Sequence, residues 1–420
     1  MERRAAGGIG RALRHRNYRL FFMGQGISLV GTWLTRFATV WMTYRLTHSG
    51  VLLGLVAFFG QAPSSVIAPL AGVLVDRWNR HRVIVWTQIA AMLQSAALAF
   101  FAFTNLMTVW HLMALGAIQA VINAFDMPAR QSFLQHMIDD RADLPNAIAL
   151  NSSMVNGARL LGPVFAAELV AFFGEGWCFA IDAASYVAVI AALLAMTVKP
   201  EHKTRRTSHW WTEMKDGWQY VGQAPLVRAV LILLAVTSVL GGSYSTLLPL
   251  VAGSTLRGGP HTLGILMASA GCGALCGALY LASRSTVLGL GGVIARVTLG
   301  LGAALVALRF ADSVYVATPI LFVTGLTWMV QMAATNTIVQ TIVDPDKLGR
   351  VMSLYAVAFF AGMPIGGLIE GAVADGIGPM NTFLCAGAAV MAAAAVFWRA
   401  LPGLRAQSRS LYVRLGLIED

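Results

Sequence analysis

Charged side chains are scarce in this chain. Asp, Glu, Lys and Arg make up 12% of its 420 residues, whereas a soluble domain carries about 25%. The mean hydropathy is +0.68, and one apolar run after another exceeds the roughly 20 residues that cross a bilayer. A water-soluble globular protein is therefore excluded. Because the backbone in lipid must satisfy its own hydrogen bonds, we expect the spans to be helices.

Cysteine is also rare, and several chemical motifs are missing. The four cysteines lie within apolar segments and form neither a disulfide framework nor a CxxC metal spacing. There is no GxxxxGK(S/T) loop, which excludes an attached ATP cassette, and no HExxH metal motif. The eight histidines are scattered. We expect no catalytic residue, no metal and no cofactor; a membrane enzyme or receptor remains as an alternative of another class.

The apolar runs, read against charged breaks, predict an all-α membrane protein with twelve transmembrane helices. The expected spans are 18–45, 51–75, 83–104, 107–128, 146–172, 177–198, 225–250, 261–282, 290–308, 314–335, 348–372 and 380–399.

The net charge of +11 comes from basic residues in short loops between the spans, and this distribution does not indicate nucleic-acid binding. With the N-terminus inside, 23 of the 30 Lys and Arg residues fall on the inner side, three on the outer side and four within or at the edge of spans. This excess of positive charge on one side predicts that both termini are cytoplasmic.

A long hydrophilic break divides the spans into six and six. We expect an amphipathic helix at the membrane interface within it, with Trp210, Trp211 and Trp218 at headgroup depth. The predicted domains are a basic cytoplasmic arm (1–17), an N-terminal six-helix bundle (18–198), this linker (199–224), a C-terminal six-helix bundle (225–400) and a cytoplasmic tail (401–420).

The two halves repeat weakly at an offset of about 205 residues. Gln135-His-Met-Ile-Asp139 stands in register with Gln340-Thr-Ile-Val-Asp344, and Gly162 falls against Gly366. Because both halves start on the same side, the pattern favours a duplication with parallel repeats, which predicts two pseudo-symmetric bundles.

The loop between the second and third expected spans carries four ionised side chains within seven residues. It reads Gly72-Val-Leu-Val-Asp76-Arg77-Trp-Asn-Arg80-His-Arg82. One acid among three arginines in a short turn goes beyond the ordinary excess of positive charge on the inner side. An ordinary positively charged loop is the alternative interpretation.

This loop resembles the signature between spans 2 and 3 of the major facilitator superfamily. Gly157-Ala-Arg-Leu-Leu-Gly162-Pro163 is similar to the Gly-Pro motif of its exporters. Further segments resemble the subfamily that contains the enterobactin exporter and macrolide efflux proteins, and they are Asn17-Tyr-Arg-Leu-Phe-Phe, Gly31-Thr-Trp-Leu-Thr-Arg36, Phe125-Asp-Met-Pro-Ala-Arg-Gln131 and Leu144-Pro-Asn-Ala-Ile-Ala-Leu-Asn-Ser-Ser153.

The resemblance implies a cytoplasmic latch that holds the two halves together, formed by Gly72, Asp76, Arg77, Arg80 and Asp126. We expect Arg77 and Arg80 to pair with both acids, and Asp76 to face the positive end of a helix dipole. The corresponding loop in the second half, which ends at Arg284, has no acid, so the latch is expected in one half only.

Glycine and proline mark a hinge or interface in spans 5 and 11, which adjoin the boundary between halves in the superfamily. The residues concerned are Gly157, Gly162, Pro163 and Gly366. Small residues let helices approach closely, and simple tight packing is compatible with this role.

Polar side chains recur on one face of several expected spans, which points to a wet interior. The resemblance implies that spans 1, 4, 7 and 10 line a central cavity. The expected cavity residues are Gln25, Thr32, Arg36, Gln119, Asn123, Tyr244, Trp328 and Gln331. Hydrogen bonding between helices is the alternative.

Ionised residues inside spans are costly and are functional candidates by default. Four are candidates for coupling to protons: Arg159, Glu168, Asp182 and Glu370. A carboxylate away from water can carry a proton, and Glu168 and Glu370 occupy nearly equivalent places in the two halves. Structural pairing of Arg159 with Glu168 is the alternative.

These observations and the resemblance predict a multi-pass exporter of the bacterial cytoplasmic (inner) membrane. It is expected to act as a monomer, by alternating access and proton antiport, on an amphipathic small molecule such as a drug, macrolide or siderophore. The same fold acting on lysophospholipid or importing a nutrient is the first alternative.

Overall fold

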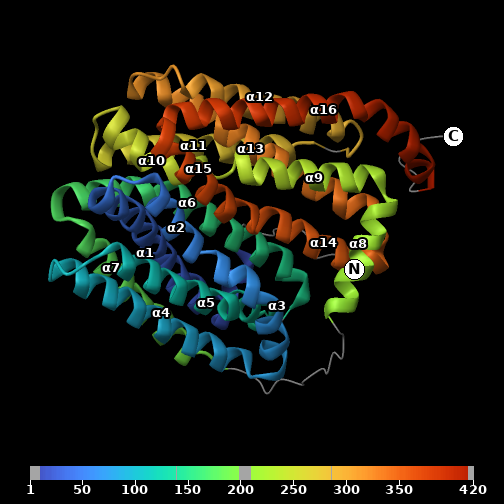
Figure 1. The fold of residues 1–420 in the computed structure, drawn as a ribbon. Helices are drawn as coiled ribbons and strands as arrows, with labels where there is room; N and C mark the ends of the chain where they lie inside the picture. Colours follow the sequence, from blue (N-terminus) through green and yellow to red (C-terminus); the bar gives the residue numbers. More distant parts are fainter. Residues whose placement is uncertain (1–9, 139, 198–209, 285, 415–420) are drawn as a thin grey trace. The chain divides into compact units, whose positions relative to one another are not determined.

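The computed structural model describes residues 10–138, 140–197, 210–284 and 286–414 (Figure 1). Regular structure within these ranges is entirely helical. The α-helices are α1 (Arg16–Thr47), α2 (Gly50–Phe59), α3 (Ala62–Arg77), α4 (Arg80–Phe103), α5 (Val109–Leu134), α6 (Leu144–Phe173), α7 (Glu175–Leu194), α8 (Trp210–Gln223), α9 (Pro225–Leu240), α10 (Tyr244–Leu250), α11 (Pro260–Ala282), α12 (Leu290–Leu308), α13 (Val314–Ile342), α14 (Pro345–Phe360), α15 (Gly362–Ile377) and α16 (Pro379–Arg414).

Eleven helical stretches in the described ranges are long and apolar enough to cross a membrane. Helix α1, the first expected span, has ample length at 32 residues but is not among the eleven, because its polar stripe makes it less apolar. Three expected spans each contain a break: between α2 and α3, between α9 and α10, and between α14 and α15. Gly60, Gly241 and Gly362 lie at these breaks.

The chain divides into two compact units. Unit 1 is Met1–Leu46 with Phe59–Arg206, and unit 2 is Thr47–Phe58 with Thr207–Asp420. Unit 2 therefore takes in α2, which the sequence prediction assigns to the N-terminal bundle. The predicted bundle boundaries remain a prediction. Residues 1–9 of the basic arm, 199–209 of the linker and the end of the tail from 415 lie outside the described residues.

In unit 1, α4 packs along α7, and α5 packs against α3 and α4 (Figure 1). Helix α4 begins after Asn79, whose side chain accepts a hydrogen bond from the Arg82 backbone N–H at 3.0 Å. Such an N-cap satisfies a helix donor that would otherwise lack a partner. These helices enclose a core that includes the fully buried Tyr18 and Ile84.

In unit 2, α11 packs along α13, and α16 runs beside α12 (Figure 1). The expected interfacial segment forms α8, and Trp218 on it is exposed. Asp216 of α8 pairs with Arg350 of α14 at 3.0 Å. The side chains of Trp210 and Trp211 lie outside the described part.

Helix α2 packs against α15 within unit 2. A Cβ added at Gly54 would lie 2.4 Å from the Gly367 carbonyl oxygen, so the two backbones are in direct contact. Asp375 accepts hydrogen bonds at the N-terminus of α2 from Ser49 Oγ at 2.6 Å and from the Gly50 and Val51 N–H groups. A carboxylate is favoured there because helix N-termini are electropositive.

The units repeat a packing feature at nearly the offset that the sequence indicates. Gly162 of α6 packs on Trp33 of α1, and Gly366 of α15 packs on Val239 of α9. Each of these glycine-bearing helices ends at a glycine with positive φ, Gly174 at 86° and Gly378 at 83°. The two glycines, on α6 and α15, are 204 positions apart in the sequence, and the residues that they contact, on α1 and α9, are 206 positions apart.

Candidate functional site

The charged loop forms a two-residue turn between α3 and α4 in unit 1. Trp78 closes α3 by donating from its N–H to the Leu74 and Val75 carbonyls. Across the turn, Arg80 Nη2 donates to Asp76 Oδ1 at 3.3 Å. The Asp76 side chain is 46% exposed, so this ion pair is screened by solvent and stabilises the unit little by itself.

Asp126 on α5 is the most heavily bonded acid of this region. Its Oδ1 accepts from Thr87 Oγ1 and Gln88 Nε2, both at 2.8 Å. Its Oδ2 accepts from Arg130 Nε at 3.0 Å and Nη2 at 2.5 Å. The expected pairing of Asp126 with Arg77 and Arg80 is therefore replaced by a pairing with Arg130, because α5 places that arginine one turn away.

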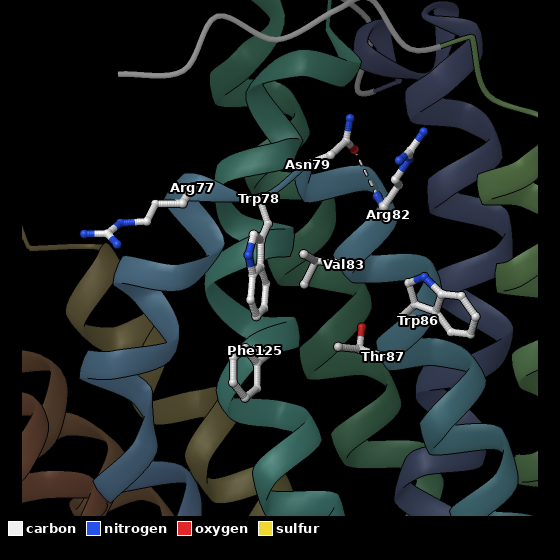
Figure 2. A pocket seen from close by; sticks show the side chains of 8 residues that line it. All are labelled: Arg77, Trp78, Asn79, Arg82, Val83, Trp86, Thr87 and Phe125. Carbon is white, nitrogen blue, oxygen red and sulfur yellow. Dashed lines mark hydrogen bonds between the residues drawn. The ribbon is translucent and has the colours of Figure 1, made fainter. Parts of the chain in front are cut away.

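An open pocket of about 540 Å³ lies beside this network in unit 1 (Figure 2). The Trp78 indole stacks on the Phe125 ring, with centroids 6.2 Å apart, while Arg77 points away from the stack. The lining residues come from the end of α3, the turn, α4 and α5, and they are Arg77, Trp78, Asn79, Arg82, Val83, Trp86, Thr87 and Phe125. Asp126 is connected to this surface through its hydrogen bond from Thr87. A latch role for the loop stays a prediction.

Asp182 on α7 joins three helices inside unit 1. It is 1% exposed, and its Oδ2 accepts from Thr35 of α1 at 2.9 Å and from Ser95 of α4 at 2.8 Å. Its Oδ1 is buried without a hydrogen-bond partner among the described residues. Gly31 makes room for this carboxylate, because a Cβ there would lie 2.7 Å from Oδ1.

The two arginines within spans of unit 1, Arg36 and Arg159, are both exposed. The Arg36 guanidinium lies 5.0 Å from the centroid of Trp33, and its charge interacts with that of Arg159. Neither arginine takes part in the ion pairs among the described residues. The alternative in which Arg159 pairs with Glu168 is therefore wrong for this structure.

The two glutamates within spans have different surroundings. Glu168 on α6 is exposed, whereas Glu370 on α15 is 2% exposed. Both Glu370 carboxylate oxygens lack a hydrogen-bond partner among the described residues, and the hydroxyl of Ser243 donates instead to the Val239 carbonyl at 2.8 Å. The glycine packing pairs match Glu370 with Ala166, two residues before Glu168, so the two glutamates occupy nearly equivalent places but differ in burial.

The expected cavity residues make mostly local contacts within their own units. In unit 1, Thr32 donates to the Ser28 carbonyl at 3.0 Å, and Gln119 donates to Asn123 at 3.2 Å. Gln25 is buried, and its Oε1 has no partner among the described residues. Their contact with a substrate stays a prediction.

In unit 2, Gln331 is fully buried and donates to Thr237 Oγ1 of α9 at 2.7 Å. The Trp328 ring stacks on Phe359, with centroids 5.9 Å apart, and Tyr244 is also buried. These contacts fit hydrogen bonding and packing between helices, so a cavity role for the three residues also stays a prediction.

Gly162 and Gly157 differ in the space around them, and this difference predicts opposite effects of alanine. A Cβ added at Gly162 would lie 2.3 Å from the Trp33 Cβ, whereas one at Gly157 meets no atom within 4 Å. We expect Gly162→Ala to destabilise the protein by about 1–3 kcal/mol through overpacking. Thermal unfolding of the purified protein measures the effect, and the matched control Gly157→Ala should unfold at or above the wild-type temperature. Equal unfolding temperatures for the two variants would contradict this packing.

Four contacts of the structure were not expected from the sequence. Arg130 follows Asp126 by four residues, a spacing that favours an ion pair on one helix face, so this partner was recognisable. The bonds from Thr35 and Ser95 to Asp182 join three helices and leave no local pattern. The Asp375 cap on α2 joins residues more than 320 positions apart and is equally invisible in the sequence.

Comparisons with known proteins bear on the whole chain. Residues 11–412 match a family model described as "Transmembrane secretion effector". The chain is 24% identical to macrolide efflux protein A of Streptococcus pyogenes, over 91% of this chain and 96% of that protein. It is 23% identical to the staphyloferrin A transporter of Staphylococcus aureus, over 90% and 95% respectively.

Solved structures share the fold at lower identity. A bacterial homolog of the human lysosomal transporter Spinster aligns with a TM-score of 0.70 and 15% identity, over 92% of this chain and 97% of that one. The nucleoside transporter NupG aligns with a TM-score of 0.70 and 15% identity, over 93% and 99%. The fold is therefore the helical fold of major facilitator transporters.

Proposed function

We propose that this chain, which belongs to the transmembrane secretion effector family of major facilitator transporters, exports an amphipathic small molecule across the bacterial cytoplasmic membrane. The observation that carries the proposal is the match to this family over almost the whole chain, together with relatives named for macrolide and multidrug efflux. The same membership excludes the alternative of a membrane enzyme. The exported compound is a drug, a macrolide or a siderophore.

Export is proposed to proceed by alternating access, with two helical bundles rocking about a central site. Gly162 with Pro163 on α6, and Gly366 on α15, would serve as the close contacts about which helices shift. Their tight packing on α1 and α9 supports this role. Gly157 is retained as an interface candidate on its sequence position alone.

Asp76, Arg77 and Arg80, with Gly72 on α3, are proposed as the cytoplasmic latch. The Asp76–Arg80 pair and the Asp126–Arg130 network support it, because a charged cluster at the end of a bundle can bias an equilibrium between two states by a few kcal/mol. Replacement of Asp76 by asparagine should then favour inward-facing states.

Coupling is proposed to be proton antiport, with Glu370 as the leading proton carrier. Its buried carboxylate has no hydrogen-bond donor within the described residues, and a charged group in such a place is costly unless it is neutralised. Asp182, with two hydroxyl donors, is a second candidate. Glu168 is exposed and is the weaker candidate.

Both termini are proposed to lie in the cytoplasm, because 23 of the 30 Lys and Arg residues then lie inside. In that orientation the charged loop between α3 and α4 is cytoplasmic, and the Arg45–Glu175 pair at 2.8 Å lies on the outer side. The protein is proposed to act as a monomer, with the proton gradient as its energy source.

Expression in a bacterium that lacks its main efflux pumps tests export directly. We expect a higher minimum inhibitory concentration and lower cellular accumulation for at least one compound in a panel of macrolides, cationic dyes and siderophores. The panel follows from the names of the relatives. Cells with the empty vector are the control, and an uncoupler that collapses the proton gradient should equalise accumulation. No difference from the empty vector for any compound would count against the proposal.

A further inference from the structure

Arg36 and Arg159 are the two arginines of unit 1 that lie inside expected spans, away from the charged ends of those spans. Arg45 pairs with Glu175 and Arg130 pairs with Asp126. In contrast, Arg36 and Arg159 take part in none of the ion pairs among the described residues. Ionised residues within membrane spans are costly, and they mark substrate or ion pathways when no structural partner accounts for them.

Arg36 and Arg159 flank one contact between α1 and α6. Trp33 of α1 packs directly on Gly162 of α6. Arg159 precedes Gly162 by three residues, and Arg36 follows Trp33 by three residues. Because α1 and α6 run parallel, with Gly26 against Met154 about two turns earlier, the two arginines lie on opposite sides of this contact, about 9 Å apart along the helix axes. Their charges interact, and the Trp33 ring supports the Arg36 guanidinium at 5.0 Å. A guanidinium held over an aromatic ring keeps its hydrogen-bond donors available for a ligand.

The other unit has the same packing without the arginines. Gly366 packs on Val239 of α9 in the same way that Gly162 packs on Trp33 of α1. The positions in unit 2 that correspond to the arginines follow from the offsets of 206 residues (α1 to α9) and 204 residues (α6 to α15). Arg36 then corresponds to Gly242, and Arg159 corresponds to Met363. The contact between the helices therefore does not require a pair of arginines, so a structural role does not account for them.

We propose that Arg36 and Arg159 form a subsite for an anionic cargo that carries at least two carboxylate groups, one for each guanidinium. The proposal rests on the proposed export function and narrows its substrate class. Planar guanidinium groups match carboxylates in a bidentate manner. Two like charges without counterions also repel each other, and a dianion removes that repulsion on binding.

Binding of a defined probe to the full-length protein tests the subsite separately from transport. Calorimetry in zwitterionic nanodiscs would compare naphthalene-2,6-dicarboxylate with its uncharged dimethyl ester. We expect Arg36→Gln and Arg159→Gln each to weaken dicarboxylate binding about ten- to hundred-fold, the range for losing hydrogen bonds to a charged group. Binding of the ester should be unchanged. Arg296→Gln, which replaces an exposed arginine of α12 in unit 2, is the matched control.

Thermal unfolding supplies a readout that a misfolded variant cannot imitate. Without probe, each glutamine variant should unfold at or above the wild-type temperature, because repulsion between the arginines is relieved. The dicarboxylate should raise the unfolding temperature of the wild type more than that of either variant. Equal dicarboxylate affinity in wild type and variants would overturn the proposal.

A phosphate group of a lipid could supply the same oxyanion chemistry. If the arginines bound lipid phosphate, adding phosphatidylglycerol to the nanodiscs would abolish probe binding by the wild type, and this result would also overturn the proposal. If the probe binds as expected but no compound is exported from cells, the export function fails while the subsite stands.

Discussion

Replacement of Asp126 by alanine is expected to destabilise the protein by about 3–5 kcal/mol, because it removes one partner of a buried ion pair. Asp126 is 8% exposed and accepts hydrogen bonds from Thr87, Gln88 and Arg130. Without it, Arg130 loses its counterion while its side chain is only 20% exposed. Thermal unfolding and denaturant titration of the purified protein measure the loss.

The neighbouring acid provides a matched control for Asp126. Asp76→Ala removes a carboxylate of the same region, but its side chain is 46% exposed, so the expected cost is only about 0–1 kcal/mol. The double variant Asp126→Ala/Arg130→Ala should be less destabilised than the sum of the two single variants. Equal stability of the Asp126 and Asp76 variants would contradict the assignment of Asp126 as the buried centre of the network.

Replacement of Glu370 by glutamine is expected to abolish uphill transport while leaving downhill exchange. The amide keeps the size of the side chain but cannot take up and release a proton. Because both carboxylate oxygens lack partners among the described residues, the substitution breaks no hydrogen bond there and should not unfold the protein. Counterflow of labelled compound measures exchange, and accumulation against a gradient measures coupling.

Glu168→Gln is the matched control for Glu370, since Glu168 is exposed on α6. It should retain accumulation driven by the proton gradient. If Glu370→Gln still accumulates compound as well as the wild type, another group carries the proton, and Asp182→Asn becomes the next variant to measure. Loss of both exchange and accumulation would instead indicate damage to the binding site.

The helices were largely predictable because length and apolarity decide them. Helix α1 was predicted although its polar stripe makes it less apolar than the eleven other stretches, since the charged arm and the polar break around it mark its ends. The breaks near Gly60, Gly241 and Gly362 were not predicted. They depend on where backbones meet, as at Gly54 and Gly367.

The candidate site was less predictable because its contacts join separate helices. Sequence position pointed to Asp126 and Asp182 as unusual acids, and the spacing of four residues made Arg130 recognisable as the partner of Asp126. It could not show that Thr35 and Ser95 bond to Asp182, because these residues lie on separate helices. It also left pairing of Arg159 with Glu168 open. Only the packing of Gly162 on Trp33 shows that Arg159 and Arg36 flank one helix contact.

Cargo movement in inverted membrane vesicles tests proton-driven export most directly. In such vesicles the former outer side faces the lumen, so an acidic lumen should drive an exported compound inward. We expect accumulation above the external concentration, release of luminal protons as cargo enters, and loss of both when the pH gradient is collapsed. Accumulation that continues unchanged without the gradient would contradict proton antiport, and no gradient-driven movement of any compound would contradict the account as a whole.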